Sequence, residues 1–159
     1  MKVVDFLSPD AIMPALAGPT KGAVLAEMSS FLAGKLAAES GRGAIDPQVL
    51  CRILEERELL ASTAIGDGIA IPHGKLDNLD RLVGALGRSG PGLAFDSIDG
   101  KPTHLVFMLV APSNSAGVHL KALARLSRLF RDAGFRQRLL DAPDSLSMYG
   151  TIAEEDAKY

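Results

Sequence analysis

An unbroken apolar segment near the middle of the chain limits the folds that this sequence can adopt. Residues 104–112, HLVFMLVAP, carry apolar side chains at every position from Leu105 to Ala111. A strand with one face in water alternates apolar and polar residues, whereas a strand that is apolar throughout is buried on both faces. We therefore expect a sheet that is covered by a layer of structure on each side.

Helical patterns stand on both sides of the expected strands in the sequence. Thr20 is expected to cap one helix, Asp46 a second with Pro47 at its first position, and Asp144 the last. This order predicts an α/β fold, in which a sheet lies between two helical layers. The expected helices are a short lead-in at SPDAIMPALAG and then KGAVLAEMSSFLAGKLAAES, QVLCRILEERELL, VHLKALARLSRLFRD, FRQRLLDA and DSLSMYGTIAEE; the strands are GIAIPH, RLVGALGRS, HLVFMLVAP and a short one around Phe95, and GRGAID is a turn.

Length and charge narrow the class of protein. The 159 residues match a single domain over 1–159, with a solvated and frayed tail from about residue 154. A net charge of −2 gives no general attraction for nucleic acid or anionic membranes, and Cys51 is the only cysteine, so it forms no internal disulfide. No apolar run approaches the ~18 residues of a membrane span. We expect a cytoplasmic protein that binds no nucleic acid and does not insert into a membrane.

The segment IGDGIAIPHGK, residues 65–75, carries the candidate chemistry. Its glycines match neither a dinucleotide-binding fingerprint nor a P-loop, because the spacing and the neighbouring residues of both motifs are missing. Pro72 is expected to end the strand GIAIPH, so that His73 lies just past it, and Gly74 allows a close backbone approach. Neutral imidazole, with a usual pKa of about 6.5, is a nucleophile that can accept and later release a phosphoryl group.

A phosphoryl group on His73 would need fixed cations or N–H donors around it. Arg57, Lys75, His119 and the amides around Gly74 are the candidates. From the residues alone, His73 could equally be a turn histidine without chemistry, and His119 a polar residue near a helix cap. Arg57 could instead pair with a neighbouring glutamate on a solvated helix face. The glutamates in question are Glu55, Glu56 and Glu58.

Two other groups of residues have simpler interpretations. His104 is expected to be structural, at the start of a strand. Lys121, Arg125 and Arg128 share one helical face, and a solvated face is a simpler explanation than a docking patch for an acidic partner. No pair of histidines has the spacing of a metal site.

Three segments together resemble a known family. LEERELLASTAIGDGIAIPHGKLDNLDRLVGAL, AFDSIDGKPTHLVFMLVAP and HLKALARLSRLF, in this order, are similar to the enzyme IIA domain of the fructose, mannitol and nitrogen-regulatory branch of the bacterial phosphotransferase system (PTS). The similarity runs from about Phe6 to Ile152. It implies a mixed sheet of about five strands between helices on both sides.

The resemblance also implies roles for individual residues. His73 would receive a phosphoryl group from a phosphohistidine on a small carrier protein, HPr or its nitrogen-branch counterpart NPr, with the tele nitrogen favoured as the acceptor although the sequence does not decide between the two. Arg57 and His119 would lie beside that phosphoryl group, with Gly74 and Lys75 as secondary candidates. No cofactor and no metal are implied.

Two functions of different class fit the resemblance. In the first, phosphorylation of His73 switches the binding of regulatory target proteins, such as sensor kinases or transporters, according to nitrogen, carbon or potassium status. In the second, the protein passes phosphate to a fructose- or mannitol-type IIB domain during sugar transport. The segment around PHGK is more similar to the nitrogen-regulatory members, which favours the first.

Overall fold

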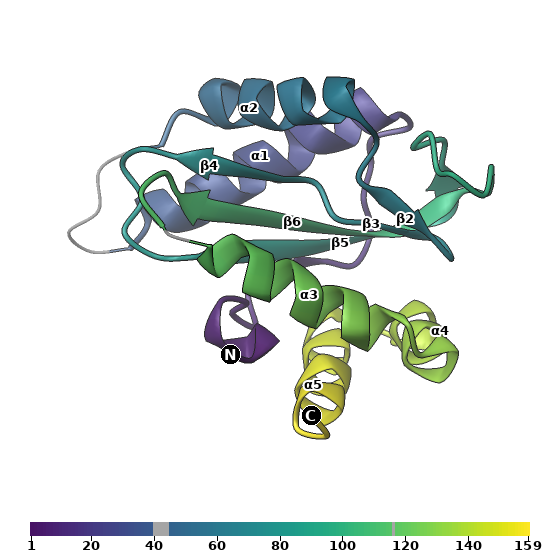
Figure 1. Ribbon diagram of the computed structural model, residues 1–159. Coiled ribbons are helices and arrows are strands. Elements are labelled where there is room, and N and C mark those ends of the chain that lie inside the picture. Colours follow the sequence, from purple (N-terminus) through teal and green to yellow (C-terminus); the bar gives the residue numbers. More distant parts are fainter. Residues whose placement is uncertain (40–44, 116) are drawn as a thin grey trace.

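The computed structural model describes residues 1–39, 45–115 and 117–159, and a single sheet lies between two layers of helices (Figure 1). Helices α1 and α2 pack against one face of the sheet, and α3, α4, α5 and the N-terminal segment against the other. The expected α/β fold is confirmed. The helices are α1 (Lys21–Ala37), α2 (Pro47–Leu60), α3 (Val118–Phe130), α4 (Ala133–Asp141) and α5 (Ser145–Asp156); the strands are β1 (Ile12–Met13), β2 (Ala64–Gly66), β3 (Ile69–Ala70), β4 (His73–Leu76), β5 (Val83–Leu93) and β6 (Thr103–Pro112); a 3₁₀ turn covers Val3–Asp5.

Six strands form the sheet in the described part of the chain, where about five were expected. Strand β6 is central: it pairs antiparallel with β5 and parallel with both β3 and β4. Strand β1 extends the sheet parallel to β5, and β2 extends it antiparallel to β3. The sheet is therefore mixed, as the resemblance implies.

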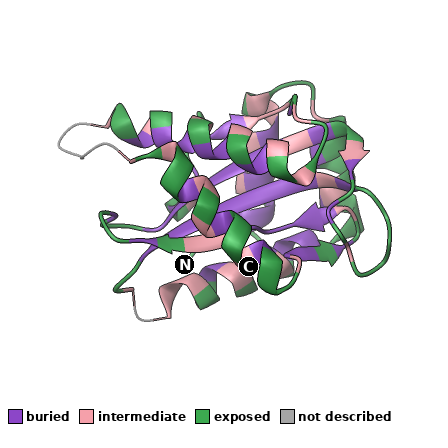
Figure 2. Ribbon diagram, turned by 90° about the horizontal axis from the view of Figure 1, so that it is seen from above, coloured by how far each residue is buried: buried purple, intermediate pink, exposed green. Residues whose placement is uncertain are grey.

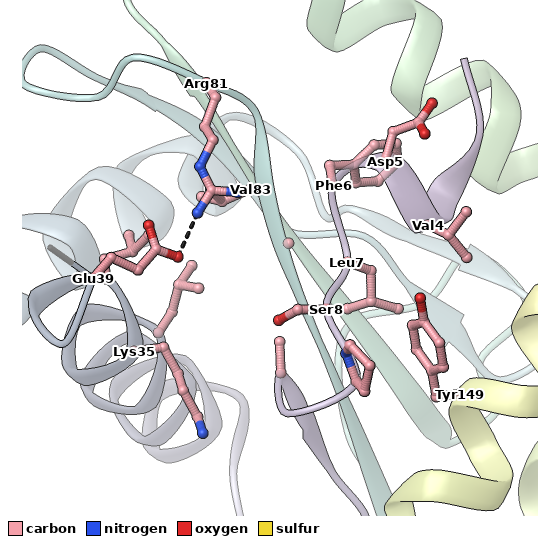
Figure 3. Close-up of a pocket in the computed structure, with 15 residues that line it drawn as sticks. Val4, Asp5, Phe6, Leu7, Ser8, Lys35, Glu39, Arg81, Val83 and Tyr149 are labelled. Atoms are coloured by element: carbon pink, nitrogen blue, oxygen red, sulfur yellow. Dashed lines mark hydrogen bonds and ion pairs between the residues drawn. The ribbon is translucent and has the colours of Figure 1, made fainter.

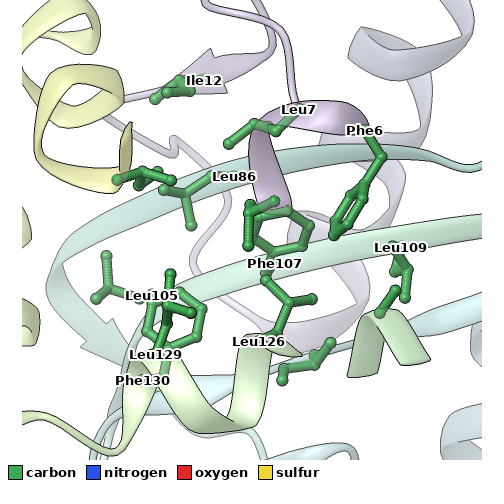
Figure 4. Packing of buried hydrophobic residues seen from close by; sticks show 14 of the residues in the cluster. Phe6, Leu7, Ile12, Leu86, Leu105, Phe107, Leu109, Leu126, Leu129 and Phe130 are labelled. Carbon is green, nitrogen blue, oxygen red and sulfur yellow. The ribbon is translucent and has the colours of Figure 1, made fainter. Parts of the chain in front are cut away.

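Strand β6 is buried on both faces, as its unbroken apolar sequence predicts. Leu105, Phe107 and Leu109 pack with α3 and the N-terminal segment (Figure 4), where the rings of Phe6 and Phe107 meet edge to face with centroids 6.1 Å apart. The alternate residues of β6 pack with α1 and α2. Figure 2 shows that the strands are largely buried, whereas the helices alternate buried and exposed residues. The two hydrophobic clusters therefore share one sheet.

The helix starts follow the local signals in the sequence. The side chains of Thr20, Asp46 and Asp144 each accept a hydrogen bond from an amide in the first turn of α1, α2 and α5, respectively. Each bond satisfies an amide that has no partner within its helix. These three predicted caps are confirmed. The turn predicted at GRGAID lies mostly outside the described residues.

Two strand assignments differ from expectation. The predicted helical lead-in at residues 8–18 is wrong, because Ile12 and Met13 form β1 beside Leu86 and Gly87. Phe95 is fully buried but lies outside the strands, so the short strand predicted there is also wrong. Both predictions rested on local sequence, whereas burial and pairing with distant residues decide the observed structure.

The C-terminal residues are more ordered than predicted. Helix α5 continues to Asp156, and Glu155 and Asp156 are buried, so the chain is not frayed and solvated from residue 154. The guanidinium of Arg125 on α3 binds the carboxylate of Asp156 at 2.6 Å, with side chains only 12% and 1% exposed. The solvated face predicted for Arg125 is therefore also wrong.

Candidate functional site

His73 is the first residue of β4, and its neighbour on β6 is Leu109. Pro72 was expected to end the strand, but its carbonyl accepts a hydrogen bond from the amide of Leu109 at 2.9 Å, and pairing with β6 resumes at once. Paired residues share a face of a sheet. The half-buried His73 therefore lies on the face of Leu109, which α3 covers, while Gly74 lies on the opposite face.

A short hydrogen bond fixes the ring of His73. Its Nδ1 lies 2.8 Å from the carbonyl oxygen of Ile71. A carbonyl oxygen only accepts, so Nδ1 carries the proton, and Nε2 of the neutral ring carries a free lone pair. Burial lowers the pKa of His73 below 6.5, and the charges of Arg57 and His119 lower it as well, although the Ile71 carbonyl and Glu58 act in the other direction. A ring whose pKa lies below 6.5 is mostly neutral at pH 7, with the Nε2 lone pair free.

Gly74 brings α2 close to the strand that carries His73. A Cβ at this position would lie 2.7 Å from Cγ2 of Ile53 on α2, closer than atoms can pack. Arg57 follows Ile53 by one helical turn, so the close approach of α2 also sets the position of Arg57. We assign Gly74 this packing role from the geometry.

Arg57 lies near enough to His73 for its charge to lower the pKa of the imidazole. Its Nη1 donates to the carbonyl of Ala61 at 2.8 Å, just past the end of α2, and the side chain is half-buried. Glu58, one of the alternative partners, binds the ammonium of Lys21 at 2.8 Å instead. Arg57 is therefore held at the end of α2, within electrostatic range of His73.

His119 enters the site from α3. Gly117 caps this helix in a left-handed conformation, with φ of 75°, so His119 lies in the first turn, where free amides and the helix dipole favour an anion. Its Nδ1 is buried and has no hydrogen-bond partner among the described residues. Burial lowers the pKa of His119, and so does the charge of the exposed Lys75. His119 thus has a buried polar atom without a partner among the described residues, and its charge acts on His73.

The structure therefore brings together the residues that the sequence singled out. The charges of Arg57 and His119 act on the ring of His73, and the charge of Lys75 acts on the ring of His119. His104 is separate, because its Nδ1 binds the carbonyl of Ser89 at 3.0 Å near the other end of β6. Among the described residues, no group of three or more histidine, cysteine, aspartate or glutamate side chains could hold a metal ion. A nucleophilic imidazole among cationic and polar groups is suited to accept a phosphoryl group.

Sequence reasoning missed two residues beside this site. Lys21 binds the buried carboxylate of Glu58, which the sequence suggested only as a possible partner of Arg57. Glu58 and Lys21 are 37 positions apart in the chain, and no local pattern links them. Only the packing of α1 against α2 brings them together.

Another hollow in the molecule is separate from His73. It lies between the N-terminal segment, the end of α1 and the start of β5, with Tyr149 at its edge (Figure 3). Arg81 and Glu39 form an ion pair across one side of it. None of His73, Arg57 and His119 lines this hollow.

In the described part of the chain, no helix is long and apolar enough to cross a membrane.

Comparisons with known proteins point to one family. Residues 5–155 match the family model described as "Phosphoenolpyruvate-dependent sugar phosphotransferase system, EIIA 2". A nitrogen regulatory protein of Bradyrhizobium diazoefficiens is 39% identical over 153 residues, which cover 96% of this chain and 95% of that protein. A fructose-specific EIIABC component of the PTS from Bacillus subtilis is 36% identical over 158 residues, which cover 98% of this chain but only 24% of that larger protein.

Solved structures share the fold. The nitrogen regulatory protein IIA-Ntr from Neisseria meningitidis superposes with a TM-score of 0.84 at 27% identity, covering 94% of this chain and 98% of that one. The IIA mannitol protein from Escherichia coli superposes with a TM-score of 0.74 at 19% identity, covering 91% and 97%. The second similarity supports the fold alone.

Proposed function

The chain belongs to the EIIA 2 family of the phosphoenolpyruvate-dependent sugar phosphotransferase system, and from this premise we propose that it is a phosphocarrier with a mainly regulatory role. His73 accepts a phosphoryl group from a phosphohistidine on an HPr-like carrier, HPr or NPr. Phosphorylation then changes which target proteins bind around His73 and thereby reports nitrogen, carbon or potassium status. Such carriers and targets would meet the protein in the cytoplasm.

The hydrogen bond between Nδ1 of His73 and the Ile71 carbonyl is the observation that carries this proposal. It leaves Nε2, the tele nitrogen, as the nucleophile. The Nε2 lone pair forms a bond to phosphorus while the bond from phosphorus to the carrier's histidine nitrogen breaks, and that nitrogen regains its lone pair. No proton transfer is needed if His73 is neutral beforehand, and its lowered pKa supports this.

Arg57 and His119 stabilise the transferred group in this proposal. Phosphoryl transfer spreads negative charge over the equatorial oxygens, so a guanidinium and an imidazole N–H beside His73 favour the transition state. The buried Nδ1 of His119 has no partner among the described residues, which supports a role toward a phosphate oxygen. Lys75 adds positive charge at the exposed side.

Exposed leucines beside the site support a protein partner. Leu60 at the end of α2 is 82% exposed, and Leu120 next to His119 is 61% exposed. A phosphoryl group adds roughly two negative charges at pH 7 and three acceptor oxygens. Such a group near these leucines would change which proteins can bind, which supports the regulatory role.

Sugar transport remains the second candidate because of one comparison. The similarity to the fructose-specific EIIABC component of Bacillus subtilis spans 98% of this chain. In this alternative, phosphorylated His73 passes its phosphoryl group to a fructose- or mannitol-type IIB domain. Similarity to a nitrogen regulatory protein over nearly the full length of both chains favours regulation.

The test is reconstitution of the phosphorelay. The protein is incubated with phosphoenolpyruvate, the general phosphotransferase enzyme and either NPr or HPr, and phosphate on the protein is followed by intact mass. We expect addition of one acid-labile, alkali-stable phosphate, faster through NPr than through HPr. Faster labelling through HPr, followed by transfer to a IIB domain, would support the transport alternative.

Two histidine variants locate the phosphate. We expect His73→Gln to abolish labelling and His104→Gln to leave it unchanged. His104 is a matched control, because it is also half-buried with its Nδ1 bound to a backbone carbonyl, yet it lies outside the site. Labelling that survives His73→Gln would exclude His73 as the acceptor.

A further inference from the structure

Glu58 places a buried carboxylate beside the candidate site. Its side chain is 5% exposed, and Lys21 on α1 binds it at 2.8 Å. The amide of Thr63 donates to the same carboxylate at 3.1 Å, and the Thr63 hydroxyl donates to it as well. Thr63 is itself buried. Glu58 therefore joins the end of α2 to the segment that leads into β2.

A line of hydrogen bonds continues from this carboxylate to the ring of His73. The carbonyl of Thr63 accepts from the amide of Ile71 at 3.0 Å. The carbonyl of Ile71 in turn accepts from Nδ1 of His73 at 2.8 Å. Every donor in the line faces toward Glu58: the imidazole N–H, the Ile71 amide and the Thr63 amide. Because Thr63 and Ile71 are buried, the bonds are shielded from water.

We propose that Glu58 is a positioning residue for His73, acting through the backbone of Thr63 and Ile71 to hold the imidazole with its proton on Nδ1 and its Nε2 lone pair free. Each bond fixes the position of the next backbone segment, from Glu58 to Thr63, from Thr63 to Ile71 and from Ile71 to the ring, and the charge of Glu58 also acts on His73 through space. This inference rests on the proposed role of His73 as the phosphoryl acceptor. It gives the buried carboxylate a function beyond joining α2 to β2.

The charges around His73 act in opposite directions. Arg57 on α2 and His119 on α3 lower the pKa of His73, whereas Glu58, also on α2, raises it. Lys21 on α1 partly neutralises Glu58, and Lys75 on β4 acts on His119. Loss of the Glu58 charge would therefore lower the pKa of His73 further and weaken the hydrogen bond that selects its tautomer.

The test compares Glu58→Gln with a matched buried carboxylate. Asp156 is 1% exposed, binds Arg125, and accepts from the backbone amide of Val4 at 3.0 Å, but none of its hydrogen bonds within the described part of the chain leads to His73. Both Glu58→Gln and Asp156→Asn remove one charge and keep a similar shape. The pKa of His73 is measured by NMR titration of its ring, and its tautomer from the ring nitrogen shifts of ¹⁵N-labelled protein.

We expect Glu58→Gln to lower the pKa of His73 and to reduce the fraction with the proton on Nδ1. Phosphoryl acceptance from the carrier should slow by roughly tenfold, by analogy with the low end of the loss when the outer partner of a metal-bound histidine is removed. Asp156→Asn should leave all three properties of His73 unchanged. Glu58→Asp, which keeps the charge, should recover part of the pKa and of the rate.

Unchanged pKa and tautomer of His73 in Glu58→Gln would overturn the inference, and so would equal shifts in Asp156→Asn. If Glu58→Gln does not fold, Glu58→Asp decides: a shortened side chain that leaves His73 unaffected also overturns it. The NMR measurements need no phosphate. They therefore test the link between Glu58 and His73 even if the native protein accepts no phosphoryl group and the proposed function fails.

Discussion

The ionisation of His73 depends on neighbours that act in opposite directions. Burial, Arg57 and His119 disfavour the imidazolium, whereas the Ile71 carbonyl and Glu58 favour it. The balance lowers the pKa, so the ring stays neutral at pH values where an ordinary histidine takes up a proton. In the proposed phosphoryl transfer, His73 would therefore need no separate base.

This balance predicts the pH dependence of phosphoryl acceptance. Only the neutral ring is a nucleophile, so the rate should stay constant as the pH falls from 8 and decline only below 6.5, the ordinary pKa of histidine. Removal of the Arg57 cation should raise the pKa of His73. The rate of the Arg57→Gln variant should therefore begin to decline at a higher pH than the rate of the native protein. Single-turnover rates with one phosphorylated carrier measure both profiles, and ionisation of the carrier cancels in the comparison. A native midpoint above 6.5, or one that Arg57→Gln does not raise, would contradict the assignment.

A second prediction for individual residues concerns the rate of phosphoryl transfer in variants of Arg57 and His119. Arg57→Ala and His119→Ala should each slow phosphoryl transfer to His73 by ~100-fold, by analogy with loss of one donor from an oxyanion hole. Stopped-flow or quenched transfer at pH 7.5 measures the rates. His104→Gln serves as the control histidine. Native rates in both alanine variants would remove the two residues from the site.

At the scale of elements, the fit between α2 and β4 depends on the absence of a side chain at Gly74. Gly74→Ala would place a methyl group 2.7 Å from Cγ2 of Ile53, and α2 would have to shift. We expect a loss of about 1–3 kcal/mol in the free energy of unfolding, typical of overpacking, and slower phosphoryl transfer because Arg57 moves with the helix. Urea unfolding measures the first effect.

Ile53→Ala offers the control for this prediction. It removes the atom that the new methyl group would meet, so the double variant Gly74→Ala/Ile53→Ala should be more stable than the sum of the two single effects allows. Strictly additive effects would mean that Gly74 does not set the distance between α2 and β4.

Elements could be predicted from sequence where local signals decide them. Thr20, Asp46 and Asp144 are adjacent to the helices they cap, and β6 is apolar throughout its length. Strand β1 was missed because its two residues depend on pairing with Leu86 and Gly87, more than 70 positions away. The start of β4 was missed because Pro72 lacks a donor, whereas its carbonyl supplies the bond that continues the pairing.

The site shows the same division. His73, Arg57 and His119 were candidates from their chemistry, but only the resemblance to a family placed them in one site, because no rule of spacing predicts that residues 57, 73 and 119 lie near one another. The series of hydrogen bonds from His73 to Glu58 runs through the backbone of Thr63 and Ile71. It cannot be predicted from the types of these two residues. The pairing of β2 with β3 brings Thr63 beside Ile71 and so completes this series of hydrogen bonds.

At the scale of the whole molecule, the two hydrophobic clusters share one sheet. Residues of β6 alternate between them, so neither helical layer can leave without exposing the central strand. The C-terminal segment is tied to the same unit, since Asp156 on α5 binds Arg125 on α3 and the amide of Val4. We therefore expect the layer that carries Arg57 and the layer that carries His119 to unfold together.

Arg125→Met tests this cooperativity. It leaves the buried carboxylate of Asp156 without its cation, and we expect a loss of about 3–5 kcal/mol in the free energy of unfolding. Urea unfolding is followed by far-UV circular dichroism, by the fluorescence of Tyr149 and Tyr159, and by the ring signal of His73. The tyrosines report on the C-terminal segment, His73 on the sheet, and circular dichroism on all helices. In a cooperative unit, the three unfolding curves shift together. A shift of the tyrosine signal alone would mean that α5 detaches first, and the layers would then be separate units despite their shared sheet.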